Sequence, residues 1–548
     1  MSILRNTAQG RVEGRDDSAN TGTWSWKGLP FAQPPIGELR WRAPVEPAPW
    51  SDVRPARDFG HPCLQNGRIY GPGANNRCDE TIASTLNQPI GSEDCLTLNI
   101  WRPATDVRDL PVLVFIHGGS NISGYSADPI YDGAHLARRA DAVVVTLNYR
   151  LGVLGFLDLP QLHAGGDAET QAEGAGSGNF ALLDILAALR WVRRNIGEFG
   201  GDPQKVTAMG QSAGAINLLA LLVSPLSSGL FQQAIALSGG ISLAANLPPG
   251  SIPTLNSAEA YKAQGRTLLL NLLVADGSAA DLAAAESHAD RLGDAGVAAY
   301  LRGQDARHIL RIVLAKGLSA SGPIPDGKDL PLDPIASIAA GRCQRMPILT
   351  GITRDEGKLF AAFLPLFGGP PGIRIDDATR FSWMQDFDPD APARLTAADL
   401  IDPAYLPVGN PATGYDARTA LLTDRFMRAS ADNLLQALGA QQREIWHYRF
   451  DWSAQSPPWN EVYGAAHLFD LPFLFGNFGP SLVSRVIGGE ANRGGRLALA
   501  EAMMGAVAAF LRHGDPGHAA LGSPWERWPA RLVFDADAGS ARISSIPG

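Results

Sequence analysis

The chain has 548 residues, of which 45% are hydrophobic and 18% are charged, a composition that can bury a large core and excludes an intrinsically disordered chain. Acidic residues outnumber basic ones by 55 to 46, so the formal net charge is -9. No Lys/Arg-rich run or basic-aromatic stripe is present to neutralise phosphates, and nucleic acid is therefore not an expected partner.

The N-terminal segment lacks the apolar core of a signal peptide, and no run of about 18 apolar residues could span a membrane. We therefore expect a soluble, cytoplasmic protein as the chain is written, or a secreted or periplasmic one if a leader has been removed. The four cysteines, Cys63, Cys78, Cys95 and Cys343, are too few and too scattered for a disulfide scaffold or a zinc site. No metal is expected.

Short apolar runs alternate with helical patterns through the first half of the chain. Residues 111–117 and 142–149 are almost wholly apolar, which is typical of strands covered on both faces, and 179–199 has helical periodicity. The series of predicted strands continues at 205–209, 232–238, 346–351 and 445–452. This alternation predicts an α/β fold with a large, mostly parallel central sheet flanked by helices.

We predict a single domain over residues 1–548, with two insertions that interrupt the alternation. Residues 241–345 are rich in Ala and Leu and indicate several helices, whereas 364–416 are rich in Pro, Gly and Asp and indicate an irregular lid or rim. Both insertions are expected to border a site. A shorter Gly- and Ala-rich segment, 163–178, fits a mobile loop and solvated filler equally well.

The pentapeptide GQSAG at 210–214 is the one Gly-x-Ser-x-Gly sequence in the chain. It lies between the predicted strand at 205–209 and a helical pattern at 213–223, which places Ser212 at a sharp turn from strand to helix. Such a turn projects the hydroxyl above the sheet and aims the first N–H groups of the helix at whatever it attacks. The turn predicts a nucleophile at Ser212 and an oxyanion donor at Ala213; the alternative is a serine that caps a helix.

Further motifs accompany GQSAG: GLPFAQPPIGELRWRAP (28–44), SEDCLTLNIW (92–101), LNYRLGVLGFL (147–157), SGNFALLDILAALRWVRRNIGEFGGDP (177–203), LFQQAIALSGG (230–240), GITRDEG (351–357) and GAAHLFDLPFLFG (464–476). Together they closely resemble the type-B carboxylesterase family, which includes cholinesterases and bacterial para-nitrobenzyl esterases. The resemblance is almost continuous through the N-terminal half of the chain. It implies an α/β-hydrolase fold and serine ester hydrolysis by one catalytic domain.

The resemblance also assigns a catalytic triad, with Ser212 as nucleophile, Glu356 of RDEG as acid and His467 of GAAH as base. In these roles His467 takes the Ser212 proton, and Glu356 orients the imidazole and stabilises the imidazolium, so that no metal or cofactor is required. Asp355 is the competitor for the acid. Ser238, in ALSGG, lacks the first glycine of the nucleophile motif and is interpreted as a structural or supporting residue.

The segment FIHGGSNISG, at 115–124, resembles the family's oxyanion motif, a His-Gly-Gly-small-aromatic run after a central strand. Gly118 and Gly119 match this motif, and Ser120 takes the small position. The resemblance implies that the backbone N–H groups of Gly119 and Ser120, together with that of Ala213, bind the oxyanion.

Two positions of this motif depart from the family. Ser120 carries a Cβ where glycine is frequent, which adds strain on the order of 1 kcal/mol if the position needs a positive φ. Asn121 replaces the usual aromatic residue, and we predict a wider or more polar substrate pocket beside it. His117, at the start of the motif, is expected to brace the loop rather than transfer protons.

The family often joins the cysteine of its EDC motif to an earlier cysteine in a Cys-x-Gln context. Cys95 and Cys63 occupy these two places. The resemblance therefore implies a disulfide between Cys63 and Cys95 if the protein is exported, and free thiols if it is not.

The combined prediction is a serine hydrolase that cleaves carboxylic esters of small molecules through an acyl-enzyme intermediate. Amide or carbamate hydrolysis by the same triad stays open, because the difference lies in protonating the leaving nitrogen. A non-catalytic, cholinesterase-like binding protein is the third alternative, and the presence of Ser212, Glu356 and His467 argues against it. The predicted partner is a small-molecule ester, and the oligomeric state, monomer or dimer, stays open.

Overall fold

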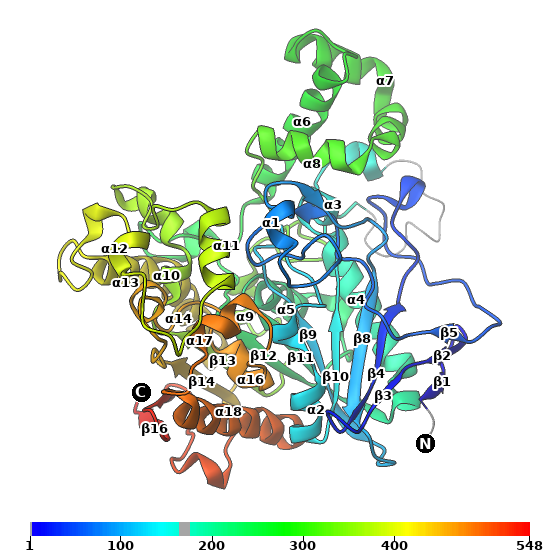
Figure 1. Cartoon of the computed structure of the whole chain (residues 1–548). Helices are drawn as coiled ribbons and strands as arrows, with labels where there is room; N and C mark the ends of the chain where they lie inside the picture. The colour runs from blue at the N-terminus through cyan, green and yellow to red at the C-terminus, as the bar shows by residue number, and fades with distance from the viewer. Residues whose placement is uncertain (1–2, 164–175) are drawn as a thin grey trace.

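A large central sheet organises the molecule, which we describe from a computed structural model covering residues 3–163 and 176–548 (Figure 1). Within these residues the sheet has 11 strands in the order β16-β15-β14-β13-β12-β11-β9-β10-β8-β4-β3. The strands are β3 (Arg15–Asp17), β4 (Thr23–Pro30), β8 (Thr97–Pro103), β9 (Leu110–Ile116), β10 (Val143–Leu147), β11 (Gly201–Gln211), β12 (Gln233–Leu237), β13 (Ile348–Thr353), β14 (Ile445–Phe450), β15 (Arg531–Ala536) and β16 (Ala541–Ile546). Neighbouring strands from β10 across to β15 are parallel, and both edges are antiparallel.

The six strand segments expected from the sequence coincide with β9 to β14, which confirms the α/β fold with a mostly parallel sheet. The predicted helix at 179–199 is α4 (Phe180–Asn195), followed by one turn of 3-10 helix. Two small sheets lie outside the central one in the described residues, β1-β2-β5 and β6-β7. Their strands are β1 (Leu4–Asn6), β2 (Arg11–Glu13), β5 (Arg54–Pro55), β6 (Gln65–Asn66) and β7 (Pro89–Ile90).

Alternate residues of β9 face opposite layers of helices. Val112, Val114 and Ile116 pack in one apolar cluster with α4 and α5 (Ala213–Val223). Leu113 and Phe115 pack in a second cluster with α2 (Ala134–Ala140), α16 (Leu471–Phe475) and α18 (Arg493–His513). Every residue of β9 is buried. Because strand residues alternate sides, helices on both faces require the unbroken apolar run that the sequence shows.

Helix α18 is the one described helix that is long and apolar enough to cross a membrane by length and composition. It lies along the sheet in Figure 1, and 72% of its apolar window is buried inside the molecule. Packing against β9, β11 and β15 therefore accounts for its apolar composition.

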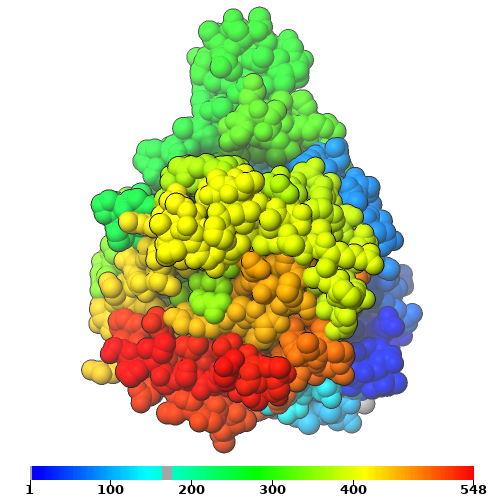
Figure 2. Space-filling view, turned by 60° about the vertical axis from the view of Figure 1, so that its left-hand side comes forward, coloured from blue at the N-terminus to red at the C-terminus, as the bar shows by residue number. Residues whose placement is uncertain are grey.

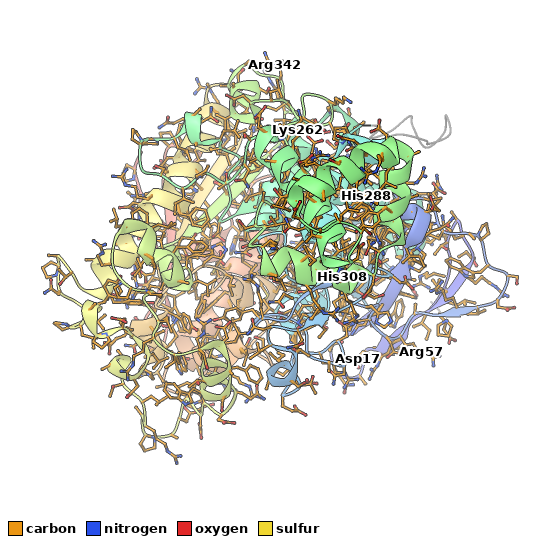
Figure 3. The ribbon with its side chains drawn as sticks, turned by 90° about the horizontal axis from the view of Figure 1, so that it is seen from above. Asp17, Arg57, Lys262, His288, His308 and Arg342 are labelled. Carbon is orange, nitrogen blue, oxygen red and sulfur yellow. A yellow bond between two sulfur atoms is a disulfide. The ribbon has the colours of Figure 1, made fainter. Side chains whose placement is uncertain are left out.

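The insertion 241–345 forms several helices, as the sequence predicts. These are α6 (Ala258–Ala275), α7 (Leu282–Gly303), α8 (Ala306–Ala315) and α9 (Pro334–Ala339). Figures 1 and 2 show α6, α7 and α8 projecting from the body as a lobe. Its apolar residues form one cluster with residues of the adjoining body, such as Leu154 and Phe180. Seen from above, the lobe carries Lys262, His288 and His308 (Figure 3). The expectation for 163–178 falls mostly on residues 164–175, which lie outside the described part of the chain.

The insertion 364–416 is less irregular than its composition suggests. It contains the helices α11 (Asp377–Gln385) and α12 (Ala397–Leu400), linked by loops. Asp376 caps α11 by accepting the Thr379 N–H, and Phe381 and Met384 of the helix are buried. The surrounding Pro, Gly and Asp residues conceal this short helix in the sequence, because nine residues contain only two turns of apolar periodicity.

A disulfide joins Cys63 and Cys95, and both residues are buried. It ties the segment before β6 to the segment before β8. Cys78 and Cys343 are free thiols.

Removing this disulfide in a Cys63→Ser/Cys95→Ser variant should lower the free energy of unfolding by about 2–4 kcal/mol, because the unfolded chain regains the freedom that a cross-link between residues 32 apart removes. The midpoint of urea denaturation, followed by fluorescence, measures the change. Cys343→Ser is the matched control and should leave the midpoint in place. Equal midpoints for all three proteins would show that the bond contributes no stability.

Candidate active site

Ser212 lies at the turn between the end of β11 and the start of α5. Its φ of 56° and ψ of -125° are strained for a residue with a side chain, at a cost of about 1–3 kcal/mol. The two glycines of the motif make the turn possible, since a Cβ on Gly210 would lie 2.2 Å from the Gly214 carbonyl oxygen, and one on Gly214 would lie 2.1 Å from that of Ile116. Strand, turn and helix are thus pressed together, and the first N–H groups of α5 have no partner within the helix.

His467 and Glu356 form a buried pair beside this turn. The Nδ1 atom of His467 lies 2.5 Å from Oε2 of Glu356, whose side chain is fully buried at the start of α10 (Glu356–Leu359). The other carboxylate oxygen accepts the Ser238 hydroxyl at 2.7 Å and the Thr353 N–H at 2.8 Å. With both oxygens satisfied, the carboxylate holds the imidazole with its proton on Nδ1 and its Nε2 free to accept. Ser238 therefore supports this pair.

Gln211 is the residue of the site that the sequence did not single out. Its side-chain Nε2 lies 3.0 Å from Nε2 of His467, so the amide donates to the imidazole nitrogen left free by Glu356. In the described structure this nitrogen bonds to Gln211 and makes no hydrogen bond with the Ser212 hydroxyl. Gln211 occupies the variable position of Gly-x-Ser-x-Gly, so the motif itself carries no signal for it.

Asp355 does not compete with Glu356 for His467. Its Oδ2 accepts the Ala465 N–H at 2.9 Å and forms an ion pair with Arg354 at 2.8 Å. The Asp355 N–H in turn donates to the Ala465 carbonyl at 2.9 Å. Asp355 therefore holds in place the segment that carries His467, while Glu356, one residue later, faces the imidazole.

The loop after β9 packs its bare backbone against Ser212. A Cβ on Gly118 would lie 2.7 Å from Oε1 of Gln211 and 2.9 Å from Cβ of Ser212. Gly119 has a φ of 109°, and a Cβ there would lie 2.2 Å from the Ser123 carbonyl oxygen, so both positions favour glycine. Ser120 has a φ of 56°, and its Cβ therefore adds the strain expected for a positive φ. Gly118, Gly119, Ser120 and Ser212 line one cavity.

His117 braces this loop. Its ring stacks on Tyr149 with centroids 4.6 Å apart, and the Tyr149 hydroxyl donates to the His117 carbonyl at 2.8 Å. The His117 Nδ1–H donates to the Gly118 carbonyl at 2.8 Å. Burial lowers the pKa of His117 to about 4, so the ring is neutral at pH 7 and holds the loop without carrying charge.

The Asn121 side chain faces away from the cavity at Ser212, contrary to the prediction that it lies beside the substrate pocket. This side chain is 2% exposed and faces Asn217 of α5, where the Asn217 amide donates to its oxygen at 2.8 Å and receives a longer bond of 3.3 Å in return. Asn121 is not among the residues that line the cavity at Ser212. The loop passes through a positive φ at Ser120 and again at Asn121, with φ 57°, and it is this turn that directs the amide toward the helix.

The cavity beside Ser212 and His467 has a volume of about 330 Å³. Phe360, whose ring centroid is 4.8 Å from that of His467, forms part of its apolar wall together with Leu359 and Phe363. Its charged side chains are Arg68, Asp128, Asp377 and Arg380. The helical turns after Glu356, and helix α11 of the 364–416 insertion, thus supply cavity walls that lie outside the sheet.

Known proteins are similar to this chain over nearly its whole length. The model of the carboxylesterase family matches residues 2–533. The para-nitrobenzyl esterase of Bacillus subtilis (strain 168) is 32% identical over 528 residues, which are 96% of this chain and 91% of that protein. The fumonisin B1 esterase of Sphingopyxis macrogoltabida is 33% identical over 546 residues, 98% of this chain and 87% of that protein.

Solved structures agree with the sequence relatives. A PNB esterase structure has a TM-score of 0.72 at 30% identity and covers 100% of this chain and 98% of its own. The Geobacillus stearothermophilus carboxylesterase EST55 has a TM-score of 0.71 at 31% identity, with the same coverage. This similarity establishes the α/β-hydrolase fold for the chain.

The Asn121–Asn217 pair leads to a prediction about stability. Asn121→Ala leaves the Asn217 amide buried without its partner, which should cost about 1–3 kcal/mol in the free energy of unfolding. Because Asn121 does not line the cavity, the ratio of kcat/KM for para-nitrophenyl butyrate and the bulkier pivalate should not change. Urea denaturation and initial rates measure the two effects.

The double variant Asn121→Ala/Asn217→Ala is the control, since it removes both amides and should recover part of the lost stability. If Asn121→Ala changes the ratio of kcat/KM for the two esters and leaves the stability unchanged, Asn121 lines the substrate pocket after all.

Proposed function

The chain belongs to the carboxylesterase family and is a carboxylic-ester hydrolase, and from this premise we propose that it cleaves small-molecule esters through a Ser212–His467–Glu356 triad and an acyl-enzyme intermediate. The observation that carries the proposal is the buried contact of 2.5 Å between His467 and Glu356 beside the strained turn at Ser212. A neutral serine hydroxyl is a weak nucleophile and needs such a base next to it.

In the proposed first step, the Ser212 hydroxyl attacks the ester carbonyl as His467 Nε2 takes its proton. Since Gln211 holds that nitrogen at 3.0 Å in the free protein, its amide has to give way to the Ser212 hydroxyl when substrate binds. Glu356 stabilises the imidazolium that forms, because its carboxylate is already aligned with Nδ1. The protonated His467 then donates to the leaving alcohol oxygen.

The negative charge that develops on the carbonyl oxygen needs donors that are aimed before the reaction begins. Backbone N–H groups of Gly119, Ser120 and Ala213 are proposed for this task, since the loop and the helix start meet at Ser212. Losing one such donor typically costs about 3 kcal/mol of transition-state stabilisation. Water activated by His467 then hydrolyses the acyl group from Ser212, which regenerates the free enzyme.

The nucleophile is tested by Ser212→Ala with para-nitrophenyl acetate and butyrate as substrates. We expect kcat/KM to fall by at least about 10³-fold, because the proposed acyl-enzyme forms on the Ser212 hydroxyl. Ser287→Ala, on the exposed side of α7 in the lobe, is the matched control and should retain wild-type activity. Activity that survives Ser212→Ala would place the chemistry at another residue.

The acid is tested by comparing two adjacent carboxylates. Glu356→Gln should reduce kcat by roughly 10³–10⁴-fold, because an amide no longer favours the imidazole tautomer that accepts the Ser212 proton. Asp355→Asn keeps an oxygen for the Ala465 N–H and should change kcat by less than about tenfold while lowering the melting temperature. The opposite order of the two effects on kcat would assign the acid to Asp355.

A further inference from the structure

Charged side chains other than the triad line the cavity at Ser212, and they are distributed unevenly. Arg68, Asp377 and Arg380 form one group, because the pKa values of both arginines respond to the Asp377 carboxylate. Asp128 is the remaining charged side chain among the described lining residues. None of these four residues has a role in the proposed triad chemistry.

Arg380 is a fixed member of the group. Its side chain is 15% exposed and forms an ion pair of 2.5 Å with Asp377, which is itself 44% exposed. Its Nε is buried and has no hydrogen-bond partner in the described structure. The ion pair neutralises the charge of Arg380 and leaves its Nε–H without an acceptor.

Arg68 is the second guanidinium, and it has no partner of its own. Its side chain makes no hydrogen bond or ion pair with any described residue. Arg68 is an exposed residue, and although partial desolvation lowers its pKa, with Asp377 opposing the change, the arginine remains charged at neutral pH. Arg68, Arg380 and Asp377 together therefore carry a net charge of +1 among the residues that line the active-site cavity.

Asp128, the other carboxylate among the lining residues, has partners of its own. It accepts the Ile130 N–H at 3.0 Å, and burial raises the pKa of its carboxyl to about 6. Its electrostatic neighbours are Cys78, Tyr125 and Tyr131, whereas the carboxylate that acts on Arg68 is Asp377. Asp377 is thus the carboxylate paired with the two arginines, and Asp128 is engaged with a different group of side chains.

The backbone that carries Arg68 is attached to the oxyanion loop. Gln65, three residues earlier, donates its side-chain amide to the Gly124 carbonyl at 2.9 Å, and its side-chain oxygen accepts the Gly124 N–H at 2.9 Å. Gly124 ends the loop that begins with Gly118 and Gly119. The position of Arg68 is therefore set relative to the loop that faces Ser212.

Arg68 is exposed and has no side-chain partner, so its guanidinium is available to an anionic ligand that enters the cavity beside Leu359, Phe360 and Phe363. A carboxylate matches the planar fork of arginine and accepts two N–H bonds from it. We propose that Arg68, with Arg380 beside it, binds a carboxylate carried by the substrate, so that the enzyme prefers esters with an ionised carboxylate, such as monoesters of dicarboxylic acids. The inference rests on the proposed ester hydrolysis at Ser212.

Monoethyl adipate and ethyl hexanoate test the inference, because they share the ethyl ester and the chain length and differ in the terminal carboxylate. Acid release at constant pH 7.5 gives kcat/KM for both esters. Arg68→Gln should lower kcat/KM for monoethyl adipate by about 10- to 100-fold and change the value for ethyl hexanoate by less than about twofold. Arg68→Lys should retain part of the preference, and salt should weaken it.

Arg342→Gln is the matched control, since it removes one positive charge from an exposed arginine outside the cavity (Figure 3) and should leave both values unchanged. If Arg68→Gln lowers kcat/KM equally for both esters, Arg68 has a structural role. If it lowers kcat/KM for neither, Arg68 is a solvated surface residue. Both results overturn the inference.

The neutral ester separates this inference from the proposed function. Hydrolysis of ethyl hexanoate that Ser212→Ala abolishes supports the proposed function whatever the result for Arg68. If wild type hydrolyses ethyl hexanoate and monoethyl adipate equally well, the inference alone fails. If it hydrolyses neither ester, the proposed function fails and the inference falls with it.

Discussion

The turn at Ser212 is the constraint on which the rest of the site depends. A residue with a side chain keeps φ 56° only where its surroundings leave no alternative, and here β11, β9 and α5 meet so closely that neither glycine of the motif can carry a Cβ. The large buried core of the sheet offsets the strain. In return, the hydroxyl and the first N–H groups of α5 have one fixed direction, toward the cavity.

The parallel sheet brings the other parts of the site to the same edge. β9 ends in the Gly118–Gly119 loop, β11 ends at Ser212, and β13 ends just before Glu356. Because neighbouring parallel strands finish on one side of the sheet, residues more than a hundred positions apart come within hydrogen-bond distance there. His467 follows β14 and is held by the Asp355–Ala465 bonds. The scaffold thus positions each group through a different strand.

Segments outside the sheet add the apolar walls and the charged side chains of the cavity. The turns after Glu356 contribute Phe360 and Phe363 to the cavity, and α11 contributes the ion pair of Asp377 and Arg380. Arg68 comes from the N-terminal region, on backbone that Gln65 ties to Gly124 of the loop after β9. The residues proposed for the chemistry therefore lie at strand ends, and those proposed for selectivity lie in the segments that surround them.

The sequence by itself determined the parallel sheet, the helical insertion and the turn at Ser212, because apolar periodicity and glycine spacing are local properties of a chain. The resemblance to a family added Glu356 and His467. Only the tertiary structure decided that Asn121 faces Asn217 and that Gln211 bonds to His467. It also grouped the two arginines of the cavity around Asp377. The reason is physical: the direction of a side chain, and which distant residue it meets, follow from the packing of separate elements and leave no trace in local spacing.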